Sequence, residues 1–412
     1  MNENKITFIS CVNDENEYEE CLKFIDNLIV PEGYEIEKIG IKGAKSITSG
    51  YNQAMKKNDA KYKIYLHQDT LIINRYILFD ILEIFKNKDI GMIGAAGSER
   101  ISTEGRWFEG KNANASVYHN VNFGIITPGD RSSEEELIEA QAIDGLIMIT
   151  QYDIDWREDI FDGWHLYDVS QTLEFIRAGY KVKVLNKKEP WIIHDCGTIW
   201  VNKDKEYNKY IEKLLNEYYE NIQPKVTIIV YIGDRFNIEY FEETIDMLIK
   251  QEYKNIQIIV VDLEEKVKNS IYKYKKYLNY FNCENYIDNI LGDVIGVIKE
   301  NCMYTSDRLK KMLNYFVINS NTNMVTSYYS YIDRNNNKVA TRKNIRYSIE
   351  PTCISLAECC KCELLTFLIS KKDINVTRIK DAEKIEDILI NKNLINKVIY
   401  LPNDFITCRI YY

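Results

Sequence analysis

Residues 61–70 read KYKIYLHQDT, and in them an apolar run ends abruptly in His67, Gln68 and Asp69. The apolar run predicts a buried strand, so the polar triplet follows at the carboxyl end of that strand. Open α/β sheets bind their ligands in the crevice beyond the carboxyl ends of the strands. The stretch therefore predicts an α/β fold with a ligand site at this strand end.

Two later segments supply further polar groups, FDGWHLYD at 161–168 and IIHDCG at 192–197. Asp69 and His194 are candidate ligands of a divalent cation, and Asp168 is a candidate general base. Together these are the parts needed to transfer a group from a diphosphate leaving group to a hydroxyl.

The bulk composition limits the class of protein. The 412 residues are long for one core and predict two domains. We expect neither a membrane-spanning segment nor a signal peptide, and the net charge of −9 argues against a nucleic-acid partner. The ten cysteines are scattered, which predicts reduced thiols and a cytoplasmic location. Cys359, Cys360 and Cys362 cluster, but without a second CxxC or a nearby His they indicate buried thiols more than zinc.

The rarer residue types are unevenly distributed. All four histidines and all five tryptophans come before residue 201. Metal ligation, proton transfer and sugar stacking draw on these side chains. We therefore expect the chemistry in the first half of the chain.

The chain repeats itself, since KITFISCVND at 5–14 returns as KVTIIVYIGD at 225–234. Each run predicts a strand, and each is followed by an amphipathic helix and a second strand. The predicted helices and second strands are 17–28 with 34–40, and 239–251 with 256–261. This alternation predicts a mostly parallel sheet covered on both faces. With a connecting helix at 203–222, the domains are expected at 1–222 and 223–412.

An ordered set of motifs spans the first copy. These motifs are ISCVND (9–14), GYNQAM (50–55), YLHQD (65–69), IGMIGAAGS (90–98), GRW (105–107), IDGLIMIT (143–150), FDGWHLYD (161–168), AGYKVKV (178–184) and IIHDCG (192–197). The set resembles a GT-A-fold, Rossmann-like glycosyltransferase of the inverting family 2 type, in the bacterial branch with HQD in place of DxD. The second copy resembles such a unit through VTIIVYIGDRF (226–236) and NIQIIVVD (255–262).

The resemblance implies a nucleotide-diphosphate sugar donor, with a UDP-sugar preferred, and Mn²⁺ or Mg²⁺ on its phosphates. Asp69 matches the metal-binding last Asp of DxD, and His194 matches the late histidine that closes the metal site. The alternatives are a turn residue for Asp69 and a hydrogen-bonded core histidine for His194. His67 stands where the first Asp of DxD contacts ribose or sugar, and whether it also ligates the metal is left open.

Asp168 is the predicted base that takes the proton of the acceptor hydroxyl. It stands where the resemblance expects the Asp of a Glu-Asp motif, at the start of a helix that ends at Ala178-Gly179-Tyr180, and Tyr167 replaces the Glu. The alternative is that Asp168 only caps this helix, in which case Asp162 is the next candidate base.

The remaining site residues follow from the resemblance, which assigns a donor group and an acceptor group. The donor group is Cys11, Val12, Asn13, Asp14, Asn52, His67, Gln68, Asp144 and Gly145. The acceptor group is Trp164 and His165, with Trp107 as a further candidate that core packing explains equally well. An indole face suits the apolar side of a sugar ring.

The second copy lacks the polar signature of the first. Lys299, Glu300 and Asn301 replace His67, Gln68 and Asp69 in the aligned segment, and this half contains no histidine. Glu386-Asp387 resembles the base motif. We therefore expect a degenerate, non-catalytic GT-A-like domain.

The leading interpretation is an inverting, metal-dependent glycosyltransferase that acts on a glycan, lipid-linked or protein hydroxyl. A peripheral membrane contact and a homo-oligomer are both compatible with the sequence. The alternative is a non-catalytic sugar- or nucleotide-binding protein, which the retention of Asp69, Asp168 and His194 disfavours. A nucleotidyltransferase would require a basic, Gly-rich phosphate loop, whereas CVNDENEYEE after the first strand is acidic.

Overall fold

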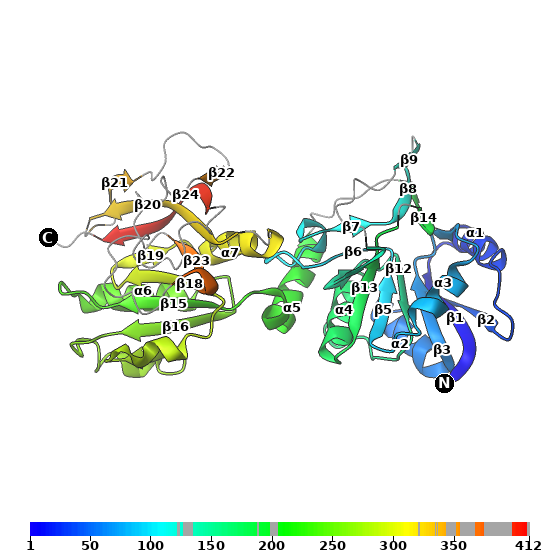
Figure 1. The fold of residues 1–412 in the computed structure, drawn as a ribbon, viewed down its shortest axis with the longest axis horizontal. Coiled ribbons are helices and arrows are strands. Elements are labelled where there is room, and N and C mark those ends of the chain that lie inside the picture. The colour runs from blue at the N-terminus through cyan, green and yellow to red at the C-terminus, as the bar shows by residue number, and fades with distance from the viewer. Residues whose placement is uncertain are drawn as a thin grey trace. The chain divides into compact units, whose positions relative to one another are not determined.

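The computed structural model of the chain describes residues 1–121, 124–126, 135–187, 189–197, 205–319, 322–333, 335, 337–342, 352–354, 367–374 and 398–409. The chain forms two compact units, Met1–Tyr218 and Tyr219–Tyr412 (Figure 1). The division falls inside helix α5 (Lys205–Ile222), at Tyr218, whose φ of −119° and ψ of 20° are not helical. The sequence placed this boundary near residue 222. The cysteine cluster at 359–362 and the Glu386-Asp387 pair lie outside the described residues.

The first unit is built on a seven-stranded sheet. In sheet order its strands are β10 (Leu137–Glu139), β13 (Lys181–Leu185), β5 (Ile90–Gly94), β12 (Ile147–Thr150), β3 (Ala60–Leu66), β1 (Asn2–Val12) and β2 (Glu35–Lys42). Strands β2, β1, β3, β5 and β13 run in one direction, and β12 and β10 run against them. The predicted α/β class with a mostly parallel mixed sheet is confirmed.

Two smaller sheets lie in the same unit. One contains β11 (Ala142–Ile143), β6 (Ala96–Ser98) and β7 (Asn114–Ala115), and the other contains β4 (Thr70–Ile72), β14 (Ile192–Gly197), β8 (Val117–Val121) and β9 (Gly124–Ile126). Strand β14 pairs antiparallel with β4 and parallel with β8. Because β4 begins directly after the His67-Gln68-Asp69 triplet, this pairing carries β14 and β8 to the end of β3.

Helices cover both faces of the seven-stranded sheet. They are α1 (Glu15–Asp26), α2 (Ile47–Lys57), α3 (Ile77–Ile84) and α4 (Tyr167–Arg177). Successive side chains of a strand point to opposite faces, so Ile6 and Phe8 of β1 pack with α1 and α3 while Ile9 packs with α2 and α4. Within the described residues, no helix combines the length and the apolar character needed to cross a membrane.

The second unit contains a ten-stranded sheet. Its main path is β17 (Leu278–Phe281), β16 (Ile256–Val261), β15 (Val226–Tyr231), β18 (Val294–Lys299), β23 (Leu368–Ser370), β20 (Met324–Ile332), β24 (Val398–Arg409) and β19 (Cys302–Tyr304), with β21 (Lys338–Arg342) on β20 and β22 (Thr352–Ile354) on β24. Helices α6 (Ile238–Ile249) and α7 (Arg308–Ile318) pack in one core cluster on this sheet. The short helices within the described residues are η1 (Trp107–Glu109), η2 (Ile271–Tyr274), η3 (Glu284–Asn289) and η5 (Lys371–Asp373).

The two sheets share a topology. The path β2-β1-β3-β12-β5-β13 has its counterpart in β16-β15-β18-β23-β20-β24, and each neighbouring pair is parallel or antiparallel in the same sense. The registers also agree, because Ile6 lies opposite Tyr62 as Val226 lies opposite Val294. The repeated sequence therefore forms a repeated α/β architecture.

Candidate active site

The three residues at the end of β3 have two roles. Gln68 holds the loop after β1, and His67 and Asp69 belong to a polar cluster. The Gln68 side-chain oxygen Oε1 accepts the backbone N–H groups of Asn13 at 2.8 Å and Asp14 at 3.1 Å. Its Nε2 donates to Glu17 of helix α1 at 2.6 Å. Gln68 therefore fastens the end of β3 to the loop after β1.

His67, Asp69 and His194 form the polar cluster. Each contributes one ligand-type atom, and these atoms all lie within 4.8 Å of one another. His194 Nε2 lies 3.3 Å from Asp69 Oδ2, and the Asp195 N–H donates to the Asp69 carbonyl at 2.9 Å. The other carboxylate oxygen, Asp69 Oδ1, is buried and has no hydrogen-bond partner among the described residues. The structure thus brings together the two predicted metal ligands and His67.

The electrostatics of this cluster keep Asp69 ionised. Burial alone would raise the pKa of Asp69, but the hydrogen bond from His194 and the charges of His67 and His194 outweigh it, so the pKa is lowered. Burial lowers the pKa of His67 despite the attraction of Asp69 and Asp144. Burial alone would lower the pKa of His194, but the hydrogen bond to Asp69 and the negative charges of Asp69, Asp144 and Asp195 together outweigh it, so the pKa is raised. A charged carboxylate and a neutral imidazole are the forms that bind cations.

Asp168 lies in the first turn of α4, buried and 9% exposed. Its Oδ2 accepts the Gly145 N–H at 2.8 Å and its Oδ1 accepts the Val169 N–H at 2.8 Å. Burial, followed by the negative charge of Asp144, raises the pKa of Asp168 to about 7. The alternative role as N-cap is wrong, because the N-cap is Leu166, a left-handed residue with φ of 55° and no capping side chain.

Tyr167, the residue before the predicted base Asp168, contacts the polar cluster, which sequence reasoning missed. Its hydroxyl is hydrogen-bonded to His67 Nε2 at 2.6 Å. A Cβ added at Gly145 would meet the Tyr167 hydroxyl oxygen at 2.0 Å. Gly145 is therefore the residue that leaves space for this tyrosine. The replacement of the expected Glu by Tyr was the available signal.

A cavity of about 430 Å³ opens beside the triplet. Seven of the predicted donor, metal and acceptor residues line it: Cys11, Val12, Asn13, His67, Gln68, Asp69 and Trp164. The other lining residues are Ile41, Gly43, Ala44, Ile47, Tyr51, Leu66 and Tyr167. Trp164, predicted on the acceptor side, is 51% exposed and shares this cavity with the donor residues.

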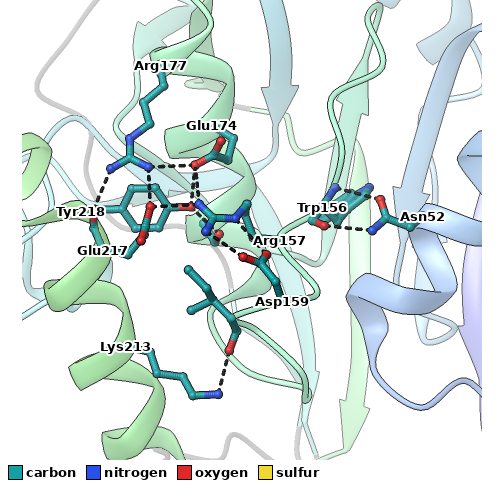
Figure 2. Close-up of polar contacts among 11 residues, drawn as sticks. Asn52, Trp156, Arg157, Asp159, Glu174, Arg177, Lys213, Glu217 and Tyr218 are labelled. Carbon is teal, nitrogen blue, oxygen red and sulfur yellow. Dashed lines mark hydrogen bonds and ion pairs between the residues drawn. The ribbon is translucent and has the colours of Figure 1, made fainter.

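Other predicted residues lie outside this cavity lining. Asn52 uses its amide on the backbone of Trp156, at 2.9 Å to the carbonyl and 2.8 Å to the N–H (Figure 2). Asp14 caps helix α1 by accepting two backbone N–H groups of its first turn. Trp107 packs against the core cluster of α1 and α3.

The loop that carries Trp164 and His165, directly before helix α4, is held from both sides. From α2, the Thr48 hydroxyl donates to the Phe161 carbonyl at 2.6 Å and the Ile47 N–H donates to the Gly163 carbonyl at 3.2 Å. From α5, Tyr210 and Lys213 both donate to Asp162, at 3.0 and 2.6 Å. His165 packs its ring on Tyr207 and Tyr210 of the same helix.

Helix α5 is itself anchored in the first unit by ion pairs. Arg157 and Arg177 both bind Glu217, at 2.9 and 2.8 Å, and both lie near Glu174 (Figure 2). Lys213 donates to the Ile160 carbonyl at 2.7 Å. The helix expected only as a connection therefore supports the loop of the predicted acceptor side.

His119 is a fourth polar residue that sequence reasoning did not assign. It lies on β8 in register with His194 on β14, and the two ring centroids are 5.5 Å apart. The only signal in the sequence was the confinement of all four histidines to the first half.

The protein is an open α/β fold. At the strand ends, His67, Asp69 and His194 form a cluster that could hold a metal ion, and the buried carboxyl group of Asp168 lies in helix α4. The chain belongs to the glycosyltransferase-like family, whose model matches residues 7–218. The family recognised in the sequence is confirmed. No curated protein matches the chain in sequence.

Several solved glycosyltransferase structures are similar to part of the chain. The structure of Staphylococcus aureus TarS 1–349 with UDP is 12% identical, with a TM-score of 0.35 over 45% of this chain and 60% of that one. The structure of the same protein with UDP-GlcNAc is 12% identical, with a TM-score of 0.35 over 46% of this chain and 59% of that one. The structure of GalNAc-T7 with UDP, GalNAc and Mn²⁺ is 11% identical, with a TM-score of 0.33 over 46% of this chain and 44% of that one. The present chain thus spans about 60% of the length of the first of these structures.

Proposed function

We propose that the protein is an inverting, metal-dependent glycosyltransferase that uses a nucleotide-diphosphate sugar, with UDP-sugars preferred. The acceptor is a hydroxyl of a glycan, a lipid-linked sugar or a protein. The observation that carries the proposal is the meeting of Asp69 and His194 with His67 at the end of β3. The Tyr167 hydroxyl is hydrogen-bonded to His67, and the next residue along the chain is the buried Asp168.

The residues of the cluster fit a divalent cation. Asp69 Oδ1 is a buried oxygen without a partner in the described part of the chain, and the pKa of Asp69 is lowered, so this carboxylate is free to accept a cation. Asp69, His194 and His67 would hold Mn²⁺, which accepts both carboxylate and imidazole ligands more readily than Mg²⁺ does. When bound, such an ion neutralises the charge that develops on the leaving diphosphate.

Asp168 is proposed to take the proton of the acceptor hydroxyl. A base works best when its pKa is near the working pH, and burial together with Asp144 brings the pKa of Asp168 to about 7. Asp162 is the poorer candidate, since the hydrogen bonds from Lys213 and Tyr210 lower its pKa to about 2. Inversion requires only this one base on the side opposite the leaving group.

The test is a screen of UDP-sugars with the full-length protein, in Mn²⁺ and in EDTA. We expect slow Mn²⁺-dependent hydrolysis of one donor in the absence of acceptor, and its loss in Asp69→Asn. Binding of a UDP-sugar without any hydrolysis or transfer would instead indicate a non-catalytic binding protein.

We further propose that the second unit has no donor site. By strand register, Lys299, Asn301 and Cys408 stand where the first unit has His67, Asp69 and His194. Glu300 stands where the first unit has Gln68, and like it accepts a backbone N–H after the first strand, from Gly233 at 3.2 Å. The loop support is thus retained, while a Lys at the strand end opposes a cation. Calorimetry should give one UDP site per full-length chain, and Asp69→Asn should remove that whole signal. A second, Asp69-independent site would contradict the proposal.

A further inference from the structure

His119 has an unsatisfied polar atom beside the metal cluster. Strands β8 and β14 pair in parallel, and His119 lies directly opposite His194. Residues paired in this way on neighbouring strands project from the same face about 4.8 Å apart, so the proximity of the two rings alone is expected. The independent observation is that His119 Nδ1 is buried and has no hydrogen-bond partner among the described residues.

An orphaned imidazole nitrogen requires an explanation. Buried polar side chains are nearly always hydrogen-bonded, because leaving one unpaired costs about 1–3 kcal/mol. A core histidine would use both ring nitrogens on neighbouring groups. Asp69 Oδ1 in the same region is also buried without a partner. A single cation bound by both residues would satisfy both atoms.

The ring spacing fits shared ligation. A ring nitrogen bound about 2.1 Å from an ion places the ring centroid about 3.2 Å from it, so two rings on one ion lie at most about 6.4 Å apart. The His119 and His194 centroids are 5.5 Å apart, and those of His67 and His194 are 6.3 Å apart. Both distances are within that limit.

We infer that His119 is a fourth protein ligand of the cation site, which makes the site a centre of three imidazoles and one carboxylate. Such a nitrogen-rich set selects against Mg²⁺, which prefers oxygen ligands, and favours Mn²⁺, Co²⁺ or Zn²⁺. The inference rests on the proposed metal site, but it concerns binding of the ion alone and not sugar transfer.

The experiment titrates metal-free full-length protein with Mn²⁺, Co²⁺ and Mg²⁺, without donor or acceptor. The test variant is His119→Gln. His165→Gln is the matched control, because His165 packs on α5. Loss of an outer-sphere partner of a ligand typically costs 10–100-fold in metal affinity, so loss of a direct ligand should cost at least about tenfold. Thermal unfolding without metal checks that each variant folds.

A second measurement needs no variant. Pulsed electron paramagnetic resonance on the Mn²⁺-loaded wild type counts the imidazoles bound to the ion, and we expect three. Two imidazoles, or a His119→Gln protein that binds Co²⁺ as the wild type does, would overturn the inference and leave the proposed transferase intact. Failure of the wild type to bind any of the three ions would overturn the metal dependence of the proposed function as well.

Discussion

Replacing Asp168 with Asn should abolish sugar transfer and at the same time change how stability depends on pH. The pKa of Asp168 is raised from 3.8 to about 7 in the folded protein, so the folded state holds this proton more tightly than the unfolded chain does. The stabilisation from the protonated carboxyl is complete below about pH 4 and is lost as the pH rises through about 7. The Asn side chain cannot ionise and lacks this dependence.

The size of the effect follows from the pKa and the hydrogen bonds. The pKa of Asp168 rises by about three on folding. This corresponds to at most about 4 kcal/mol of stability that the wild type loses between pH 4 and pH 8. Asn keeps one acceptor oxygen, so either the Gly145 or the Val169 N–H loses its partner, at a cost of about 1–3 kcal/mol at every pH. The variant should therefore be the less stable protein at pH 4 and should equal or exceed the wild type at pH 8.

Chemical denaturation at pH 4, 6 and 8 measures the stability, and transfer assays measure the rate. Loss of a general base typically costs ~10²–10⁴-fold in rate. Asp162→Asn is the matched control. Asp162 is exposed and its pKa is about 2, so this carboxylate stays ionised across the pH range in the wild type. The Asp162→Asn variant should retain transfer. Stability curves of wild type and Asp168→Asn that run parallel with pH would refute the raised pKa. More than half of the wild-type rate in Asp168→Asn would place the base elsewhere.

Three further predictions concern the same site. Asp69→Asn should weaken Mn²⁺-dependent UDP binding measured by calorimetry, and equal wild-type affinity in Mn²⁺ and EDTA would remove the metal from the proposal. The wild-type kcat/KM for transfer should fall as the pH drops through about 7, because Asp168 must be ionised to act as a base; a flat profile between pH 6 and 8 would contradict this. Gly145→Ala should lower both transfer and the melting temperature, because its Cβ would meet the Tyr167 hydroxyl at 2.0 Å; a fully active, equally stable variant would show that Tyr167 can move without consequence.

The alternation of elements could be read from the sequence. The strand expected at 256–261 is β16 (Ile256–Val261), and the helix expected at 239–251 is α6 (Ile238–Ile249). Hydrophobic patterns with a period of two or 3.6 residues are properties of residues that are near one another in sequence. They can therefore be recognised without knowledge of the rest of the chain. The same reasoning located the strand that ends at His67 and the connecting helix, found at Lys205–Ile222.

The environment of each side chain could not be read in this way. The pairing of β4 with β14 brings His194 to Asp69, and the register of β14 with β8 adds His119. Asn52 was expected in the donor group, yet its amide is used on the backbone of Trp156. None of these contacts joins residues that are neighbours in sequence.

The class of fold, the repeat and the types of side chain available for chemistry could be recognised before folding is considered, because they depend on local patterns and residue identity. Only the folded chain makes Asp168 a buried acid with a pKa of about 7 and not a helix cap. Folding also brings the Tyr167 hydroxyl to His67, within the cluster that contains Asp69 and His194. Burial and proximity are set by segments that meet only after folding, and the pKa of a carboxyl group depends on both.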